Sequence, residues 1–211
     1  MNRRWELEEY LSGFEHLYPG ILKWCAGILS EVRTGRRSIL GVIVEERLSG
    51  LAVTKNSRSA KLCHISLDER LQHKGLGLDL AHLAVDTMLS SGARNIRVTT
   101  SEEVAALHGR FFSRLGFSPT AQQRGVYRPG CYEMVWEASR WSLARKRVYR
   151  VKAGCDYRPA APSLDSCVAK WSGSQWEPLL GIPLPLTGVP DDSGHSAVPT
   201  FCYSDLQLTG S

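Results

Sequence analysis

The segment Gln72–Gly77 (QHKGLG) is the part of the sequence whose residue types and order most clearly indicate chemistry. It follows an apolar run at 62–67 and precedes a helix-like run at 78–90. The first N–H groups of a helix have no partner within the helix, and the helix dipole adds about half a positive charge there. Glycines at 75 and 77 let this backbone approach a ligand, because no Cβ stands in the way. The segment therefore predicts a site for a phosphate-bearing cofactor, and a pyrophosphate would fit it.

Two common phosphate-binding motifs do not fit this segment. A P-loop needs a Lys and a hydroxyl residue after its last glycine, and neither follows Gly77. A dinucleotide-binding fingerprint needs a third glycine, where this chain has Leu80. The pattern (Gln/Arg)-x-x-Gly-x-(Gly/Ala) is matched at every fixed position of 72–77. The loop is thus similar to the acyl-CoA-binding loop of the GNAT superfamily of N-acyltransferases.

A second segment downstream carries the same resemblance. Residues 111–117 (FFSRLGF) resemble the family's aromatic-Tyr-x-x-Leu-Gly-Phe segment, in which a helix ends on glycine and a strand begins. Gly116 is predicted to be the C′ glycine of that helix. The stretch 67–71 also resembles the hydrophobic-Asp-Pro-Glu sequence before the family's loop, with Glu69 in place of the proline. The resemblance covers roughly residues 10–137.

The resemblance implies an α/β (α+β) protein with the GNAT fold. This fold has a mixed central sheet of about six to seven strands, flanked by helices on both faces. Apolar spacing predicts helices within 5–34, interrupted at Tyr18-Pro19-Gly20. β-rich runs then predict strands at residues 38–45, 50–55, 61–67, 93–100, 117–126 and 132–137. The family's first strand, which precedes the helices, is hard to see in this sequence.

The composition changes after residue 138, which predicts a domain boundary. We expect a GNAT N-acetyltransferase domain at 1–138, followed by a basic arm and a Pro/Gly/Ser-rich tail at 139–211. Because the tail has no sustained periodicity, we expect it to be weakly structured. Its scattered aromatic residues, among them Trp171 and Trp176, leave room for partial docking on the domain or on a partner.

The resemblance implies acetyl-CoA as the cosubstrate and assigns its contacts by position. The strand before the loop would hold the pantetheine arm through its main chain at Ile65, Ser66 and Leu67. The pyrophosphate would lie on the loop. The residues that the resemblance places there are Gln72, His73, Lys74, Gly75, Leu76 and Gly77, with Phe112 from the downstream motif also assigned to the cofactor site.

Acetyl transfer to an amine needs a base for the amine, a donor for the oxyanion and a proton for the leaving thiolate. The family often supplies that proton from a Tyr, and this chain has Phe112 at the position. The thiolate could leave unprotonated, since a thiol pKa is about 8.5. His108, four residues earlier on the same helix face, could replace the acid. The third alternative is a tyrosine from elsewhere, with Tyr127 and Tyr132 as candidates.

The candidate bases are Glu102 and Glu103, which follow the strand at 93–100 beside the cleft that the fold implies. Their other interpretation is helix capping, because Ser101 has the features of an N-cap and acidic residues are common in a first helical turn. His64 and Glu133 are weaker candidates, and for His64 a structural role is the favoured interpretation.

Length, charge and cysteine spacing limit the class of protein. The chain has 211 residues and a formal net charge of +5. It contains no apolar run long enough to span a membrane and no apolar signal core at its N-terminus, so we expect a cytoplasmic protein without a membrane partner. Its cysteines show no zinc spacing, which predicts reduced thiols and no metal.

The predicted function is an N-acetyltransferase that moves an acetyl group from acetyl-CoA to a primary amine by direct attack in a ternary complex. The acceptor amine is not readable from the sequence, and a homodimer is compatible with it. One alternative is a non-catalytic CoA-binding sensor or interaction module. Another is an RNA-associated, toxin-like enzyme acting on aminoacyl-tRNA, which the basic runs at 33–37 and 145–147 favour slightly.

Overall fold

The computed structural model describes residues 4–16, 18–73, 75–124, 130–140, 142–143, 166–179 and 201–202. The N-terminal part contains α1 (Arg4–Ser12), α2 (Ile21–Arg33), β1 (Arg37–Val44), β2 (Arg47–Lys55), β3 (Ser59–Leu67) and the 3-10 turn η1 (Glu69–Leu71). The remaining elements are α3 (Leu76–Ser90), β4 (Asn95–Ser101), α4 (Glu102–Leu115), β5 (Ser118–Arg124), β6 (Tyr132–Ser139), β7 (Ser166–Trp171), β8 (Trp176–Pro178) and β9 (Phe201–Cys202).

The strands form one mixed sheet in the order β5-β6-β4-β3-β2-β1-β7-β8, and β9 pairs with β3 off this path. The β3–β4 pair is parallel, whereas the other described pairs are antiparallel. β1 to β6 are the six strands that the sequence predicts. The C-terminal part of the chain adds β7, β8 and β9.

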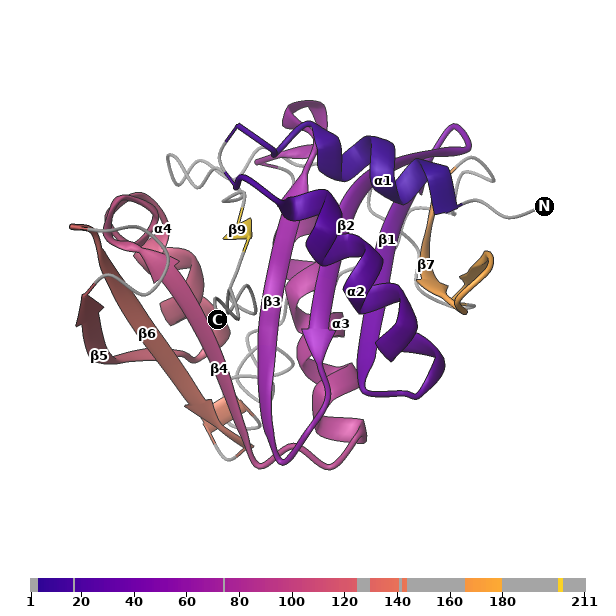
Figure 1. Ribbon diagram of the computed structural model, residues 1–211. Helices are drawn as coiled ribbons and strands as arrows, with labels where there is room; N and C mark the ends of the chain where they lie inside the picture. Colours follow the sequence, from indigo (N-terminus) through magenta and orange to yellow (C-terminus); the bar gives the residue numbers. More distant parts are fainter. Residues whose placement is uncertain are drawn as a thin grey trace, which may run out of the picture.

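Helices cover both faces of the sheet, as predicted (Figure 1). α1 and α2 lie over one face, where Leu11 and Ile28 belong to a cluster of buried apolar side chains. α3 and α4 cover the other face, where Leu80, Met88 and Phe112 belong to a second cluster. β1 and β2 are buried along nearly their whole length because both of their faces are covered, which explains their near-continuous apolar sequences.

The segment 166–179 is the main difference from the expectation of a weakly structured tail. β7 pairs with β1 and β8 pairs with β7, so this segment extends the sheet beyond β1. Trp171 is fully buried, and its ring lies edge-on to that of Trp176 at a centroid distance of 5.1 Å. Burial of two indoles accounts for the order of this short hairpin. Of the two possibilities that the sequence leaves for these residues, the domain or a partner, the structure shows them packed on the domain.

The helix and strand ends follow the glycine signals of the sequence. Gly116 adopts a left-handed conformation at the end of α4 with φ of 97°, as predicted. No strand precedes α1 among the residues that the structure describes. The basic run at 145–147 and Tyr127 lie outside the described residues.

Candidate functional site

β3 and β4 separate after a short stretch of pairing. Ser59–Lys61 pair with Asn95–Arg97, and the register contains no further pair between these strands within the described chain. β3 nevertheless continues to Leu67 and β4 to Ser101. Because the two strands are parallel, their carboxyl ends diverge at the same end of the sheet. We call the space between these unpaired stretches the splay.

A β-bulge in β3 accompanies this divergence. Val53 of β2 lies opposite His64. The next residue, Thr54, lies opposite Leu62, so Cys63 is the extra residue of the bulge. A bulge bends its strand and increases the local twist. Here it begins directly after the last pair with β4, and it therefore gives a physical reason for the divergence.

The loop at 72–77 follows β3 at the open end of the splay. The side-chain amide of Gln72 donates a hydrogen bond to the main-chain oxygen of Leu67 at 3.0 Å, which ties the loop to the end of β3. His73 and Gly75 have φ angles of 60° and 81°, in the left-handed region that glycine tolerates best. Lys74 lies outside the described residues. The predicted order of strand, glycine turn and helix is confirmed.

The N-terminus of α3 points its backbone donors toward this loop. The N–H groups of Leu78 and Asp79 donate to the oxygen of Gly75 as the first bonds of the helix. The N–H groups of Leu76 and Gly77 come before these first helical bonds. No side chain among the described residues caps this end of α3. No atom of the described chain lies within 4 Å of where a Cβ on Gly75 would stand. The site is open and carries the partial positive charge of the helix end.

A buried hydrogen-bond chain connects β3 to α1. The Tyr10 hydroxyl lies 3.1 Å from Ser66 Oγ, which lies 2.7 Å from His64 Nε2. The rings of Phe14 and Trp24 also lie near His64, at centroid distances of 5.6 and 6.4 Å. Burial lowers the pKa of His64 to about 3, so the imidazole is neutral at physiological pH. This agrees with the structural role that the sequence favours for His64.

Glu133 on β6 is the buried carboxyl group at the end of the sheet where the splay opens. It lies opposite Ser101 of β4 and is 4% exposed. Burial raises its pKa to about 7, although the charge of Lys61 acts in the opposite sense. Its Oε2 atom has no hydrogen-bond partner among the described residues. A carboxyl group that titrates near neutral pH is suited to proton transfer.

Sequence reasoning placed Glu133 below Glu102 and Glu103 as a candidate base. Residues 132–137 alternate along a strand, so Glu133 shares a face with Val135, which is also buried. The sequence contains no signal for this burial, because the apolar residues Met134, Trp136 and Ala138 alternate with Glu133 and lie on the opposite face.

The predicted catalytic residues lie on α4. Glu102 and Glu103 are exposed in its first turn. Ser101 Oγ accepts a hydrogen bond from the N–H of Val104 at 3.2 Å, which confirms the predicted N-cap. His108 is half-buried further along the helix. The geometry gives the two glutamates a capping position, and their part in catalysis stays a prediction.

Phe112 and Tyr132 differ in their surroundings. Phe112 has no exposed surface, and its ring packs in the core against Phe117 and Trp136 at centroid distances of 6.3 and 5.3 Å. Tyr132 is 38% exposed, with the guanidinium of Arg124 over its ring at 5.8 Å. The structure therefore places Phe112 as a core residue, and its contact with a cofactor stays a prediction.

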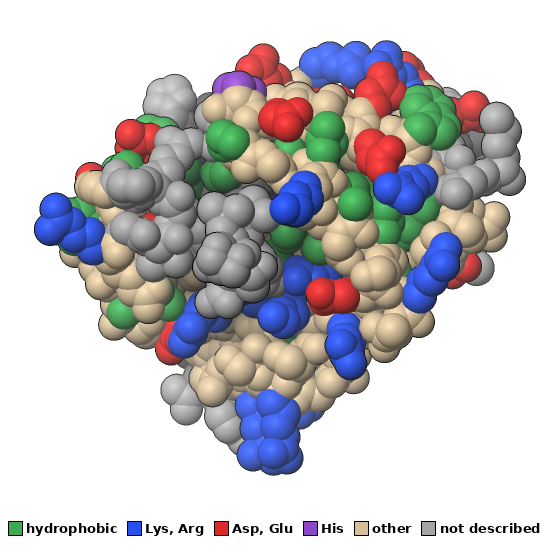
Figure 2. Space-filling view, viewed as in Figure 1, with side chains coloured by type: hydrophobic (Ala, Val, Ile, Leu, Met, Phe, Trp, Pro, Cys, Tyr) green, Lys and Arg blue, Asp and Glu red, His purple; other side chains and the backbone are tan. Residues whose placement is uncertain are grey.

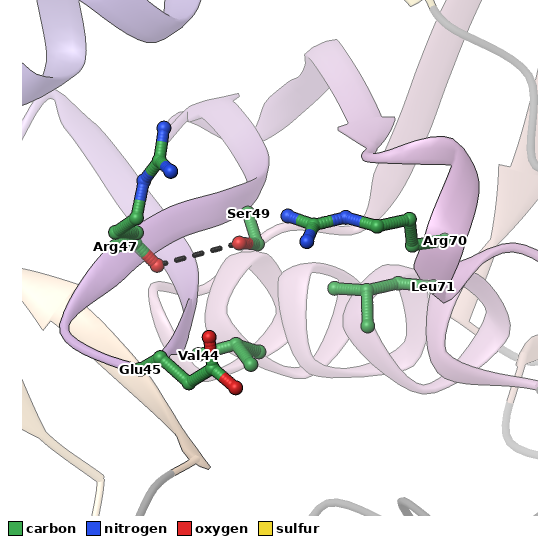
Figure 3. Close-up of a pocket in the computed structure, with 6 residues that line it drawn as sticks. All are labelled: Val44, Glu45, Arg47, Ser49, Arg70 and Leu71. Atoms are coloured by element: carbon green, nitrogen blue, oxygen red, sulfur yellow. Dashed lines mark hydrogen bonds between the residues drawn. The ribbon is translucent and has the colours of Figure 1, made fainter.

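A small pocket that the sequence did not predict lies between the β1–β2 turn and η1 (Figure 3). Its volume is about 170 Å³. The side chain of Arg70 extends toward Ser49, whereas the guanidinium of Arg47 points away from the pocket (Figure 3). Glu45 adds an opposite charge. The lining residues are Val44, Glu45, Arg47, Ser49, Arg70 and Leu71.

Two searches for other kinds of site give negative results for the described part of the chain. No three His, Cys, Asp or Glu residues there are grouped so that they could hold a metal ion. None of its helices combines the length and apolar character needed to cross a membrane.

Comparison with known proteins identifies the fold. No protein-family model matches the sequence, and no curated protein is similar to it. A crystal structure from Desulfovibrio desulfuricans, assigned to the GNAT family of acetyltransferases, superposes with a TM-score of 0.55 at 20% identity, over 65% of this chain and 92% of that one. An aminoglycoside 6'-acetyltransferase of type Ii gives 0.52 at 12% identity, over 64% and 88%. The chain has the fold of the GNAT acetyltransferases, as its sequence resemblance predicts.

Proposed function

We propose that the protein is an N-acetyltransferase that moves an acetyl group from acetyl-CoA to a primary amine by direct attack in a ternary complex. The observation that carries this proposal is the splay. β3 leaves β4 after Lys61 and leads, through η1 and the loop at 72–77, to the N-terminus of α3, which no described side chain caps. An unpaired strand edge followed by a helix N-terminus can bind an amide-containing arm and then a diphosphate.

The residues at the splay fit such a cosubstrate. The main chain of Ile65–Leu67 would pair with the pantetheine arm. The backbone of Gln72–Gly77 would bind the pyrophosphate, with the open space around Gly75 leaving room for it. When bound, acetyl-CoA supplies the activated acetyl group, and the chain orients both reactants.

Glu133 is the residue that we propose takes the proton from the acceptor amine, directly or through a water. Its raised pKa matches a base that works near neutral pH. Activity should then increase as pH rises through about 7 and level off above it, because the carboxylate is the active form. Glu102, Glu103 and His108 are the alternative proton-transfer groups. The thiolate would leave without a tyrosine donor, since Phe112 has no proton to give.

The first test is binding of acetyl-CoA by calorimetry. Gly75→Glu should abolish binding, because it places bulk and negative charge at the diphosphate site. Gly92→Glu is the matched control, since Gly92 also has a positive φ and open space around its Cβ position but lies at the other end of α3. Unchanged affinity in Gly75→Glu would contradict the cofactor assignment.

The second test is turnover with a panel of primary amines, followed through release of the CoA thiol. Glu133→Gln should lower kcat by about 10²-fold or more while leaving the affinity for acetyl-CoA intact. Binding of acetyl-CoA without turnover on any amine would favour the non-catalytic sensor.

The basic run at 33–37 is divided in the structure, since Arg33 and Arg36 are exposed and Arg37 is buried. Arg37, in the basic run at 33–37, is 4% exposed and donates to Glu31 at 2.8 Å and to Cys63 Sγ at 3.3 Å. Basic side chains are spread over the α1–α2 face with acidic ones among them (Figure 2). The RNA-associated alternative, the cytoplasmic location and the homodimer stay predictions of the sequence.

A further inference from the structure

The C-terminal strand β9 lies where the cofactor arm is expected. Cys202 pairs with His64 and Phe201 with Ile65, in antiparallel orientation. These two residues of β3 follow the point where pairing with β4 ends. Figure 1 shows β9 in the space between β3 and β4. The chain's own backbone therefore pairs with the strand edge that the splay leaves open.

An acyl-CoA arm and β9 cannot use this edge together. A strand directs one row of N–H and C=O groups toward each neighbour, and neighbouring strands lie about 4.8 Å apart. The pantetheine arm contains amides and is extended, so it would pair with the edge as an added peptide strand does. Ile65 belongs both to the expected cofactor contacts and to the β9 pairing.

The same chain can supply this strand. β8 ends at Pro178, and its place in the sheet is separated from β3 by β7, β1 and β2. Four strand spacings amount to roughly 19 Å. The residues between Pro178 and Phe201 could span on the order of 70 Å when extended. The connection therefore imposes no strain on the pairing.

We propose that the segment around Phe201–Cys202 is an autoinhibitory strand that occupies the acyl-CoA slot and must leave before acetyl-CoA binds. This inference rests on the proposed function. Two residues of β3 are paired with it within the described part of the chain, so a cofactor that contacts both the strand edge and the α3 N-terminus can displace it. If the strand is bound in about nine molecules of ten, the apparent Kd for acetyl-CoA is raised about tenfold.

Calorimetry on a truncated chain tests the competition. A chain that ends at residue 180 keeps β7 and β8 but lacks β9. Its Kd for acetyl-CoA should be about tenfold lower than that of the full chain. The double variant Phe201→Pro/Cys202→Pro should reproduce most of this change, because one of these two adjacent residues directs its N–H toward β3 and the double variant removes that donor. Ser193→Pro is the matched control and should leave the Kd unchanged. Equal Kd values for the truncated and full chains would overturn the proposal.

Hydrogen exchange separates this proposal from the proposed function. Of the two adjacent amides of His64 and Ile65, one faces β2 and the other faces β9. Without cofactor, the amide that faces β9 should exchange faster in the truncated chain than in the full chain. Faster exchange in a truncated chain that does not bind acetyl-CoA would overturn both the acetyltransferase assignment and the competition. Equal exchange with normal binding would overturn the inhibitory strand alone. If the protection of this amide from exchange depends on protein concentration, a second copy of the chain supplies the strand. That result would overturn the proposal that the strand comes from the same chain.

A peptide of residues 197–207 gives the reciprocal test. Added to the truncated chain, it should raise the apparent Kd for acetyl-CoA, and the same peptide carrying both Phe201→Pro and Cys202→Pro should not. Equal effects of the two peptides would contradict strand pairing as the mechanism.

Discussion

The C-terminal segment joins the sheet at two places that differ in extent. β7 pairs with β1 over five residues and brings two tryptophans into the core. β9 pairs with β3 over two residues in the splay. The first contact extends the sheet beyond β1, whereas the second lies where we propose that the cofactor binds. A tail of uniform composition therefore contains one part that is structural and one that we propose is exchangeable.

The side chains at the two places differ in kind as well. Those under the β7–β8 hairpin are apolar, as at Trp171 and Trp176. The side chains on the strands around the splay include two buried titratable groups, His64 of β3 and Glu133 of β6. Loss of the hairpin should therefore affect stability at every pH, whereas changes at the splay should affect pH dependence and ligand binding.

The largest expected effect comes from deleting the hairpin. Deletion of residues 155–211 removes both tryptophans, and truncation of one buried tryptophan typically costs about 3–5 kcal/mol. The Tm should fall by at least ~10 °C or the chain should fail to fold. Deletion of 181–211 should shift the Tm by less than ~2 °C. The sequence alone predicts that the longer deletion leaves the core folded, and equal Tm values for the two deletions would favour that view.

A single substitution tests the same contact. Trp171→Ala should lower the free energy of unfolding by about 3–5 kcal/mol, because the side chain is fully buried. Trp5→Ala is the control, since Trp5 is 56% exposed, and it should cost less than about 0.5 kcal/mol. Urea denaturation measures both. Similar losses in the two variants would argue against the hairpin as part of the core.

The buried carboxyl group predicts a pH-dependent effect. The pKa of Glu133 is raised by burial from 4.5 to about 7, so folding favours its protonated form. The unfolded chain loses this proton near pH 4.5, and stability therefore falls as pH rises toward 7 and is constant above it. Relative to wild type, Glu133→Gln should gain about 3 kcal/mol across this window.

Denaturation at several pH values checks this expectation. Ser118→Ala, at an exposed position of β5, removes no titrating group and serves as the control. A stability difference between Glu133→Gln and wild type that is the same at pH 4 and pH 8 would show that Glu133 is not buried as described.

The smallest expected effect concerns a close approach beneath the hairpin. A Cβ on Gly41 would stand 2.7 Å from a ring carbon of Trp176, so Gly41→Ala should cost about 1–3 kcal/mol through overpacking. Gly27 is exposed within α2, with no neighbour within 4 Å of its Cβ position among the described residues. Gly27→Ala should therefore stabilise the protein by up to about 1 kcal/mol. Thermal unfolding of both variants tests the contrast. It should be smaller in the chain lacking 155–211, if that chain folds, because the contact with Leu48 at 2.9 Å remains.

Local signals in the sequence were sufficient for much of the fold. Gly116 and Ser101 marked the two ends of α4, and the loop at 72–77 marked the start of α3. These features depend on residues close together in the sequence, where backbone preferences and caps act directly.

Features that depend on distant residues were not predictable in the same way. The position of β7 on β1 joins segments more than a hundred residues apart, and nothing in either segment names its partner. The burial of Glu133 depends on the elements around it, and the alternation of 132–137 gives no sign of it, because the apolar Met134 and Trp136 lie on the opposite face. The β9 pairing involves too few residues to give a pattern.

The pairing of β1 with β7 also has a consequence for how the chain is made. During synthesis from the N-terminus, β1 to β6 emerge before residues 166–171 are available. Until then, one edge of a largely apolar strand has no neighbour, and such edges promote association between chains. The step that closes this edge brings together residues far apart in sequence, which slows folding. The nascent protein should therefore be most prone to aggregation between completion of β6 and arrival of the two tryptophans.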